Sequence, residues 1–236
     1  MSIKSKNTYK ISVVAFIDIL GFKEMIKKSE KDTNEYERVW NALRVIKRWK
    51  KDHRSRHTET TSISIFSDSI VISSSSKPIM NTLKYVIEDV MYLQENLLQY
   101  EILCRGGVSV GNLYHSKNKM FGPAFLEAYR LESIEAKYPR VILLKNTIDK
   151  IKDIDRNDQV WPMFADIKNN YLREDKENPD IMYIDYLHKY ISNRNQHIDN
   201  FINHELQNQK DEKIIIKYKW LKTYWKSFND TEGTIV

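Results

Sequence analysis

Two aspartates lie where packing alone does not explain a carboxylate. Asp18 interrupts the otherwise apolar run VVAFIDILGF, and Asp68 lies at the turn of IFSDSIV. A lone carboxylate in a buried strand is costly unless it is paired or binds a metal, and carboxylate oxygens are good ligands for hard divalent cations. Ordinary turn chemistry is an alternative explanation for Asp68. Together the two residues indicate a divalent-metal site.

Two arginines stand in segments that are otherwise apolar or small. Arg105 opens the stretch RGGVSVG, and Arg130 lies in FLEAYRLE. Guanidinium groups stabilise the charge that develops on a phosphoryl group in the transition state. Two metal-binding carboxylates and two arginines are the groups that phosphoryl transfer needs. An ion pair with a nearby glutamate, Glu127 or Glu132, is the alternative for each arginine.

The sequence lacks the residue patterns of several other kinds of functional site. The sequence has no Walker-type loop, no HExxH and no Cys/His spacing typical of zinc. Its single cysteine, Cys104, lies in an apolar segment and is predicted to be a core residue. One cysteine makes no internal disulfide, and no apolar run reaches the roughly 20 residues that span a bilayer. We therefore expect a cytoplasmic protein without a membrane partner.

The elements that must position these side chains follow from the hydrophobic pattern. Residues 11–20 form a nearly continuous apolar run, which predicts a strand buried on both faces. Residues 61–73 alternate apolar and small polar side chains, which predicts a hairpin turning at Asp68-Ser69. Further strands are predicted over residues 103–114 and 141–144. Helices are predicted over residues 23–50, where the helix is broken into two pieces, over a segment that begins at Pro78, and over residues 123–136. This β-α-β-β-α-β-α-β order predicts an α+β fold, with a mostly antiparallel sheet and helices packed on one face.

The pattern weakens after residue 150. We therefore interpret 1–150 as the core and 151–236 as a C-terminal extension of the same domain. The extension is predicted to contain short strands at 161–166 and 182–184, and one or two helices over 190–227 that pack through Trp220 and Trp225.

Basic residues are concentrated near the N-terminus. The net charge is +6, yet residues 1–57 alone hold 15 lysines and arginines against 7 acidic residues. One interpretation is a surface for a polyanion. The alternative is that the run is the solvated end of a helix whose apolar face is Val39, Leu43 and Ile46. Because no nucleic-acid motif accompanies the run, we expect no nucleic-acid partner. The run comprises Arg44, Lys47, Arg48, Lys50, Lys51, Arg54 and Arg56, interleaved with Trp49, His53 and His57.

Glycine is scarce, with 6 in 236 residues. In such a chain each glycine is expected to mark a tight turn or a close approach of the backbone to a ligand. Five of them lie beside the segments already described: Gly21, Gly106, Gly107, Gly111 and Gly122.

Over roughly residues 11–145 these segments, in this order, resemble the catalytic domain of class III nucleotidyl cyclases. FIDILGF resembles the family's metal-binding signature, and IFSDSIV stands where the family has its second metal-binding Asp. RGGVSVG resembles the motif whose Arg contacts the triphosphate, and GPAFLEAYRLE the motif whose Arg stabilises the transition state. The resemblance implies a ferredoxin-like palm fold. It also implies that Asp18, Asp68 and the backbone carbonyl of Ile19 bind two Mg²⁺ or Mn²⁺ ions. Arg105 would contact the triphosphate, and Arg130 would stabilise the transition state. The nucleotide would lie beside Phe16, Gly21 and Phe22.

The sequence departs from the family at the residues that read the base. Ser64 occupies the position of the family's purine-reading Lys, and Lys119 that of its second base reader, an Asp. Leu126 replaces the family's Asn, and the later phosphate-contacting Lys has no clear counterpart beyond residue 150. The metal and phosphate groups are thus kept while the purine-reading groups are replaced. Lys119 could donate a hydrogen bond to a uracil carbonyl.

FSDSIVIS, RGGVSVGNLYH and FGPAFLEAYRLE are similar to the pyrimidine cyclases of the bacterial Pycsar anti-phage system. The resemblance implies conversion of UTP to 3′,5′-cyclic UMP and pyrophosphate, with CTP as the other pyrimidine substrate, and a separate effector that binds the product. It also implies a homodimer with shared active sites. Each site would take its metals and Arg105 from one protomer, and Ser64, Lys119 and Arg130 from the other.

Two other functions remain open from the sequence. One is a cyclase that uses a purine nucleoside triphosphate, which other polar groups reading the base would favour. The other is a non-catalytic module that binds a nucleotide or polyanion, for which the basic run over 44–57 is the best evidence.

Overall fold

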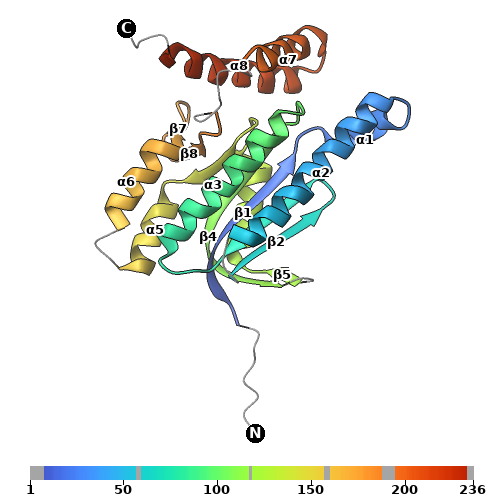
Figure 1. Ribbon diagram of the computed structural model, residues 1–236. Coiled ribbons are helices and arrows are strands. Elements are labelled where there is room, and N and C mark those ends of the chain that lie inside the picture. Colours follow the sequence, from blue (N-terminus) through green and yellow to red (C-terminus); the bar gives the residue numbers. More distant parts are fainter. Residues whose placement is uncertain (1–7, 57–59, 117–118, 157–159, 188–194, 233–236) are drawn as a thin grey trace.

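The structure is a computed structural model that describes residues 8–56, 60–116, 119–156, 160–187 and 195–232 (Figure 1). Its eight strands are β1 (Lys10–Ile19), β2 (Thr61–Phe66), β3 (Ser69–Ser74), β4 (Cys104–Ser116), β5 (Lys119–Phe121), β6 (Val141–Leu144), β7 (Leu172–Glu174) and β8 (Ile181–Ile184). Its helices are α1 (Phe22–Ser29), α2 (Thr33–Arg56), α3 (Ile79–Leu98), α4 (Pro123–Arg130) with the π-helical turn η1 (Leu131–Glu135), α5 (Asn146–Asp155), α6 (Val160–Tyr171), α7 (Asn195–Asn208) and α8 (Glu212–Glu232).

The strands form a mixed sheet in the order β2-β3-β1-β4-β6-β8-β7, and β5 pairs with the far end of β4. The pairs β2–β3, β3–β1 and β1–β4 are antiparallel, and helices connect β1 to β2 and β3 to β4. This is the βαββαβ arrangement of ferredoxin-like folds. One pair, β4–β6, is parallel, and it joins this unit to the remaining described strands. The expected fold class, a largely antiparallel α+β sheet with flanking helices and a helical C-terminal part, is confirmed.

Helices cover both faces of the sheet, so the expectation that they pack on one face was wrong. Odd-numbered residues of β1, such as Val13 and Ile17, pack in the main core with α2 and α3. Even-numbered residues, such as Val14 and Phe16, pack against Ala124 and Ala128 of α4. Both sets are buried, because successive side chains of a strand point to opposite faces and each face has a helix on it.

The segment after residue 150 differs from its prediction in one element. Residues 161–166, expected as a strand, belong to helix α6. Met163, Phe164, Ile167 and Tyr171 lie on its core-facing side, and this spacing of three and four residues is typical of a helix. The strand predicted at 182–184 is β8, and the predicted C-terminal helices are α7 and α8.

Helix α8 is anchored in the core by its second half. Trp225 is completely buried, and Trp220 packs on the edge of the core. The Tyr224 hydroxyl donates a hydrogen bond to Asp185 and accepts one from the backbone N–H of Leu187 at 3.1 Å. The anchor places α7 and α8 at the end of the sheet where α1 begins (Figure 1). Within the described residues, no helix is both long and apolar enough to cross a membrane.

The basic run lies on α2, as the helical alternative predicts. Val39 and Ile46 are buried as expected, but Leu43 is exposed, and Trp49 is buried in the core. His57 lies outside the described residues, as do the side chains of residues 52–56.

Two glycines position the segments around Asp18. Gly21 has φ 75° and forms the left-handed turn between β1 and α1. Gly107 of β4 packs against the end of α4 and the start of η1. A β-carbon on Gly107 would be 2.4 Å from Cβ of Leu131 and 2.5 Å from the carbonyl oxygen of Ala128. Only glycine allows η1 to approach β4 this closely. Gly111 makes no such close approach, because a β-carbon there would be in ordinary contact with Ala124.

Candidate active site

The candidate site lies at the end of β1, on the face of the sheet that α4 covers. Asp18 pairs directly with Ser69 of β3 on one side and with Arg105 of β4 on the other. Directly paired residues of antiparallel strands point to the same face. The fold therefore brings Asp18, Ser69 and Arg105 together, from positions up to 87 residues apart in the sequence.

Asp68 lies in the tight turn between β2 and β3, beside the end of β1. Its backbone carbonyl accepts a hydrogen bond of 3.0 Å from the backbone N–H of Ile19. Ser67, the other turn residue, has a left-handed φ of 53°. The turn thus holds Asp68 next to Asp18, and the two carboxylates are close enough to repel each other. The sequence predicted this hairpin and its position correctly.

The surroundings of Asp18 disfavour its charged form. The pKa of Asp18 is raised from 3.8 to about 6, first by burial and then by the negative charges of Glu132 and Asp68. The positive charge of Arg105 and a hydrogen bond from Ser69 oppose them. Acidic groups thus outweigh basic ones around this half-buried carboxylate, and a divalent cation would relieve the imbalance.

The residues fit a metal in part. Asp18 and Asp68 have carboxylate oxygens, and the candidate backbone carbonyl is that of Ile19, the last residue of β1, whose N–H is hydrogen-bonded to Asp68. Among the described residues, however, no group of three or more His, Cys, Asp or Glu side chains could hold a metal ion. A cation here would complete its oxygen shell with ligands from elsewhere, as Mg²⁺ commonly does with water and substrate phosphates.

Arg105 is paired with a buried glutamate. Its Nε lies 2.8 Å from Oε1 of Glu132 in η1, whose side chain is almost completely buried. The ion pair that the sequence raised as an alternative is therefore present. Arg105 remains partly exposed and points to the same face as Asp18.

Arg130 lies at the end of α4 and forms ion pairs with two glutamates of its own chain. Its guanidinium donates hydrogen bonds to Glu127 and Glu135 at 2.9–3.0 Å, and both partners raise its pKa. None of its interactions with the described residues involves Asp18 or Asp68. Within the described part of one chain, Arg105 is thus paired with Asp18 across the sheet, whereas the ion pairs of Arg130 are with Glu127 and Glu135.

One of the two residues predicted to read the base, Ser64, contacts a histidine that the sequence did not single out. The Ser64 hydroxyl lies 2.7 Å from Nε2 of His115, and Nδ1 of the same ring lies 2.7 Å from the Ser73 hydroxyl. Burial lowers the pKa of His115. Lys119, the first residue of β5, is exposed and pairs with Ser116, the neighbour of His115. The β4–β5 hairpin therefore brings Ser64 and Lys119 to the same region.

The aromatic residues of FIDILGF are part of the core. The ring of Phe16 packs against the rings of Phe125 and Tyr129. Its centroid lies 5.9 Å from that of Phe125 and 5.3 Å from that of Tyr129. Phe22, the first residue of α1, is buried in the main core, and Gly21 forms the turn before it. Their packing fixes the turn that follows Asp18.

Comparisons with known proteins give weak similarities only. No protein-family model matches the sequence, and a search of curated proteins found no match. Among solved structures, the guanylyl cyclase Cya2 is 14% identical with a TM-score of 0.46, over 75% of this chain and 92% of that one. An adenylate/guanylate cyclase/hydrolase from Silicibacter pomeroyi is 13% identical with a TM-score of 0.40, over 75% and 95% of the two chains. A class III adenylyl cyclase-like ATP-binding protein from Pseudomonas aeruginosa is 11% identical with a TM-score of 0.41, over 69% and 44%. The function proposed below therefore rests on the residues of this chain.

Proposed function

We propose that the protein is a nucleotidyl cyclase that converts a nucleoside triphosphate, preferably UTP, to the 3′,5′-cyclic nucleotide and pyrophosphate. One observation carries the proposal: Asp18 and Asp68 meet at the end of β1, with Arg105 on the same face. The product would act as a second messenger for a separate effector in anti-phage defence, as the resemblance to Pycsar cyclases implies.

Each residue has a distinct task in this reaction. Asp18, Asp68 and the carbonyl of Ile19 would hold two Mg²⁺ or Mn²⁺ ions, which lower the pKa of the ribose 3′-hydroxyl and neutralise phosphate charge. Arg105 orients the triphosphate from the same face. Arg130 stabilises the charge that develops on the α-phosphate and the leaving pyrophosphate.

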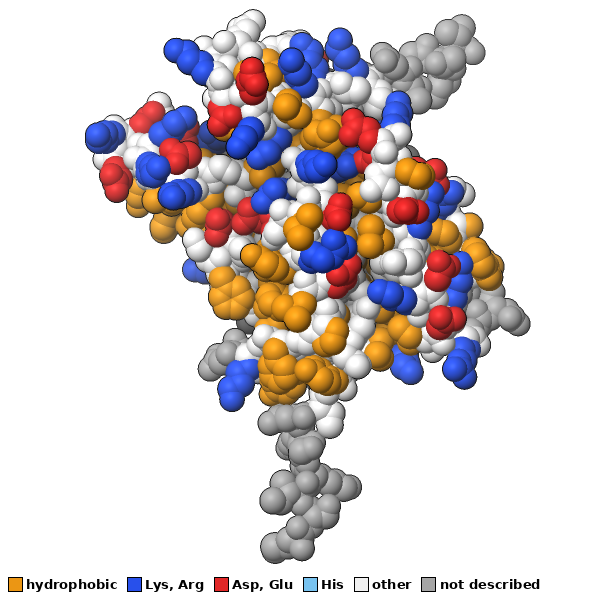
Figure 2. Space-filling model, turned by 180° about the vertical axis from the view of Figure 1, so that it is seen from behind, with side chains coloured by type: hydrophobic (Ala, Val, Ile, Leu, Met, Phe, Trp, Pro, Cys, Tyr) orange, Lys and Arg blue, Asp and Glu red, His pale blue; other side chains and the backbone are white. Residues whose placement is uncertain are grey.

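A homodimer would bring Arg130 to the site. The exposed hydrophobic residues near Arg130 include Leu126 and Tyr129 on α4 and Ile134 on η1, which are 50–64% exposed. Phe66 and Phe121, at the ends of β2 and β5, are also more than half exposed. Figure 2 shows hydrophobic side chains gathered on this side of the molecule, away from α2 and α3. Such a surface is typical of a protein interface, and we propose a second copy of the chain as its partner.

Four separate incubations with ATP, GTP, CTP and UTP in the presence of Mn²⁺ test the proposed reaction. We expect mass spectrometry to identify cyclic UMP as the main product, because Ser64 and Lys119 lack the groups that match a purine. Unpaired buried base atoms cost roughly 1–3 kcal/mol each. No cyclic product from any of the four would contradict the proposal, and salt-dependent nucleic-acid binding without pyrophosphate release would favour a polyanion-binding module.

Lys119 tests the choice between the pyrimidines. Its ammonium is exposed and can donate to the O4 carbonyl of uracil, whereas cytosine presents an amino group there. We expect Lys119→Glu to lower the ratio of cyclic UMP to cyclic CMP formed from equimolar UTP and CTP, because a carboxylate accepts from an amino group and repels a carbonyl. Lys213→Gln, on the exposed start of α8, is the control. An unchanged ratio in Lys119→Glu would show that Lys119 does not read the base.

A further inference from the structure

A histidine joins two serines on the face of the sheet that carries the candidate site. Ser64 of β2 pairs with Val71 of β3, and Ser73 of β3 pairs with Val14 of β1. Both valines belong to the cluster that packs against α4, so the serines point to the same face. His115 reaches them from β4: its Nε2 lies 2.7 Å from the Ser64 hydroxyl, and its Nδ1 lies 2.7 Å from the Ser73 hydroxyl. One ring thus links Ser73 to Ser64, the residue at the base-reading position.

The ring of His115 is neutral at neutral pH. Burial lowers its pKa, and the positive charge of Lys50 acts in the same direction. A neutral imidazole has one N–H donor and one acceptor nitrogen. The two serines therefore have opposite roles, because one donates a hydrogen bond to the ring and the other accepts one from it.

The burial of Ser73 decides between the two arrangements. Ser73 is only 4% exposed, and among the described residues its hydroxyl has no hydrogen-bond partner besides His115. A buried hydroxyl hydrogen without an acceptor is costly, so Ser73 donates its hydrogen to Nδ1. The proton of the ring is then on Nε2, and this N–H donates to the oxygen of Ser64.

Ser64 keeps its own hydroxyl hydrogen for a ligand. Its oxygen accepts from His115, and within the described part of the chain its hydroxyl makes no other hydrogen bond. The residue is half-buried, so a ligand can reach it. Lys119, the other residue predicted to read the base, has only donors. Both residues therefore offer donors to the base.

We propose that His115 is a positioning residue that fixes Ser64 as a hydrogen-bond donor toward the base of the substrate. The identity of that ligand as a nucleoside triphosphate rests on the proposed function. The O4 carbonyl of uracil has two lone pairs and can accept from both Ser64 and Lys119, whereas cytosine presents an amino group at this position. The orientation of one histidine ring thereby favours UTP over CTP.

NMR of the full chain with isotope-labelled histidine nitrogens tests the position of the proton without nucleotide or turnover. We expect Nδ1 of His115 to give the signal of an unprotonated ring nitrogen and Nε2 that of a protonated one. The signals of His115 are identified by their loss in His115→Gln. A proton on Nδ1, or a charged ring at neutral pH, would overturn the proposal whether or not the protein is a cyclase.

The ratio of products tests the consequence for the substrate. From equimolar UTP and CTP, we expect His115→Phe to lower the ratio of cyclic UMP to cyclic CMP about tenfold, the effect of one hydrogen bond. His115→Gln should restore most of the ratio, because its amide carries both a donor and an acceptor. In a Ser64→Ala background, His115→Phe should have no further effect on the ratio, because His115 acts through Ser64. An equally large effect in that background would show a merely structural role.

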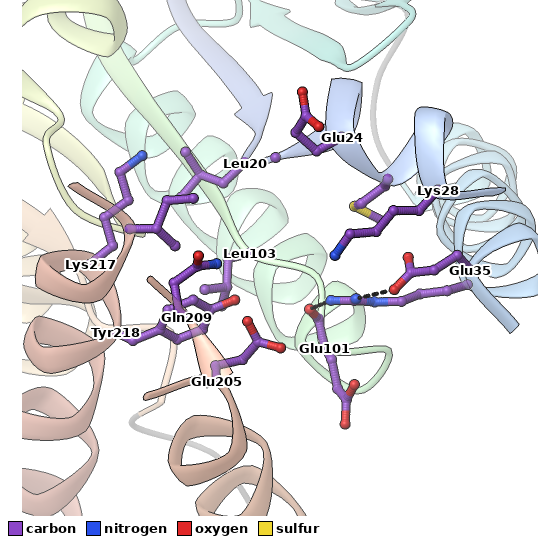
Figure 3. Close-up of a pocket in the computed structure, with 14 residues that line it drawn as sticks. Leu20, Glu24, Lys28, Glu35, Glu101, Leu103, Glu205, Gln209, Lys217 and Tyr218 are labelled. Carbon is purple, nitrogen blue, oxygen red and sulfur yellow. Dashed lines mark hydrogen bonds and ion pairs between the residues drawn. The ribbon is translucent and has the colours of Figure 1, made fainter. Parts of the chain in front are cut away.

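Gln209 provides the control. Figure 3 shows it in a separate cavity of about 210 Å³, which Leu20 and Gly21 line from the end of β1. Neither Ser64 nor His115 lines this cavity. Gln209→Ala should therefore leave the ratio of products unchanged.

The outcomes separate this inference from the proposed function. If His115→Phe is folded, as judged by circular dichroism, and keeps the preference of the unaltered protein, the role of His115 is wrong even where cyclisation is observed. If no nucleoside triphosphate is cyclised, the dissociation constants of UTP and CTP, measured by calorimetry with Mn²⁺, take the place of the product ratio. A preference for UTP that His115→Phe removes would then support the role of His115 although the proposed reaction fails. Equal affinities of the unaltered protein for UTP and CTP, or no binding of either, would overturn it.

Discussion

Asp18→Asn should abolish cyclisation of every nucleoside triphosphate, with a loss of roughly a thousandfold or more. The substitution keeps the shape of the side chain and removes the charge that would hold the metal ions. Product formation measured by mass spectrometry checks the loss, and Asp153→Asn on the exposed face of α5 is the control. Substantial activity in Asp18→Asn would contradict the metal assignment.

Stability provides a second readout of Asp18 that does not depend on activity. A carboxyl whose pKa is raised by folding stabilises the fold in its protonated form. This contribution is present below the unfolded value of 3.8 and is lost as the pH rises through about 6. In metal-free protein, Asp18→Asn should therefore be more stable than the unaltered chain at pH 8, with a smaller difference at pH 5.

Unfolding in urea at both pH values, with a chelator and then with Mn²⁺, measures this effect. Mn²⁺ should stabilise the unaltered protein at pH 8 and leave Asp18→Asn unchanged, because a ligand that binds only the folded state stabilises it. Equal stabilisation of both proteins by Mn²⁺ would place the cation elsewhere.

The elements around the site could be predicted because their sequence patterns are local. The apolar run of β1 and the alternation in β2 and β3 each correspond to one strand or hairpin. The strand prediction for residues 161–166 is wrong, because a short apolar run with aromatic residues fits a strand and a helix equally well. The face covered by α4 was missed for a related reason, since the pattern of β1 shows two buried faces without showing what buries them.

The site itself could be predicted only where a residue is unusual in its own segment. Asp18 stands out in an apolar strand, and Asp68 stands out at a turn. His115 carries no such signal, since a histidine in a strand is common. Its position at the site follows from tertiary packing, because His115 of β4 reaches Ser64 of β2 across the sheet.

The second large effect should appear when two inactive variants are mixed. Arg130→Ala should lower activity by roughly 10³–10⁵-fold, the range measured for arginines that stabilise a phosphoryl-transfer transition state. The ion pairs of Arg130 offer a structural explanation for such a loss, since Glu127 and Glu135 hold it on α4. The double variant Glu127→Gln/Glu135→Gln removes these pairs and keeps the arginine, so it should remain active if Arg130 acts on the substrate.

Mixing Asp18→Asn with Arg130→Ala then tests whether two chains share each site. In a symmetric dimer, a mixed pair has one site with both Asp18 and Arg130 intact and one site with neither. Random exchange of equal amounts makes half of the dimers mixed, so about a quarter of the sites should work.

Activity of about that level, appearing only after the two variants are allowed to exchange, would place Arg130 in the site of the partner subunit. A mixture that stays inactive at every ratio, although mass spectrometry shows mixed dimers, would mean that Arg130 acts within its own chain or only through its ion pairs. The exposed residues Leu126, Tyr129 and Ile134 make the first result the expected one, because burying this apolar surface against a second copy brings Arg130 into the same interface.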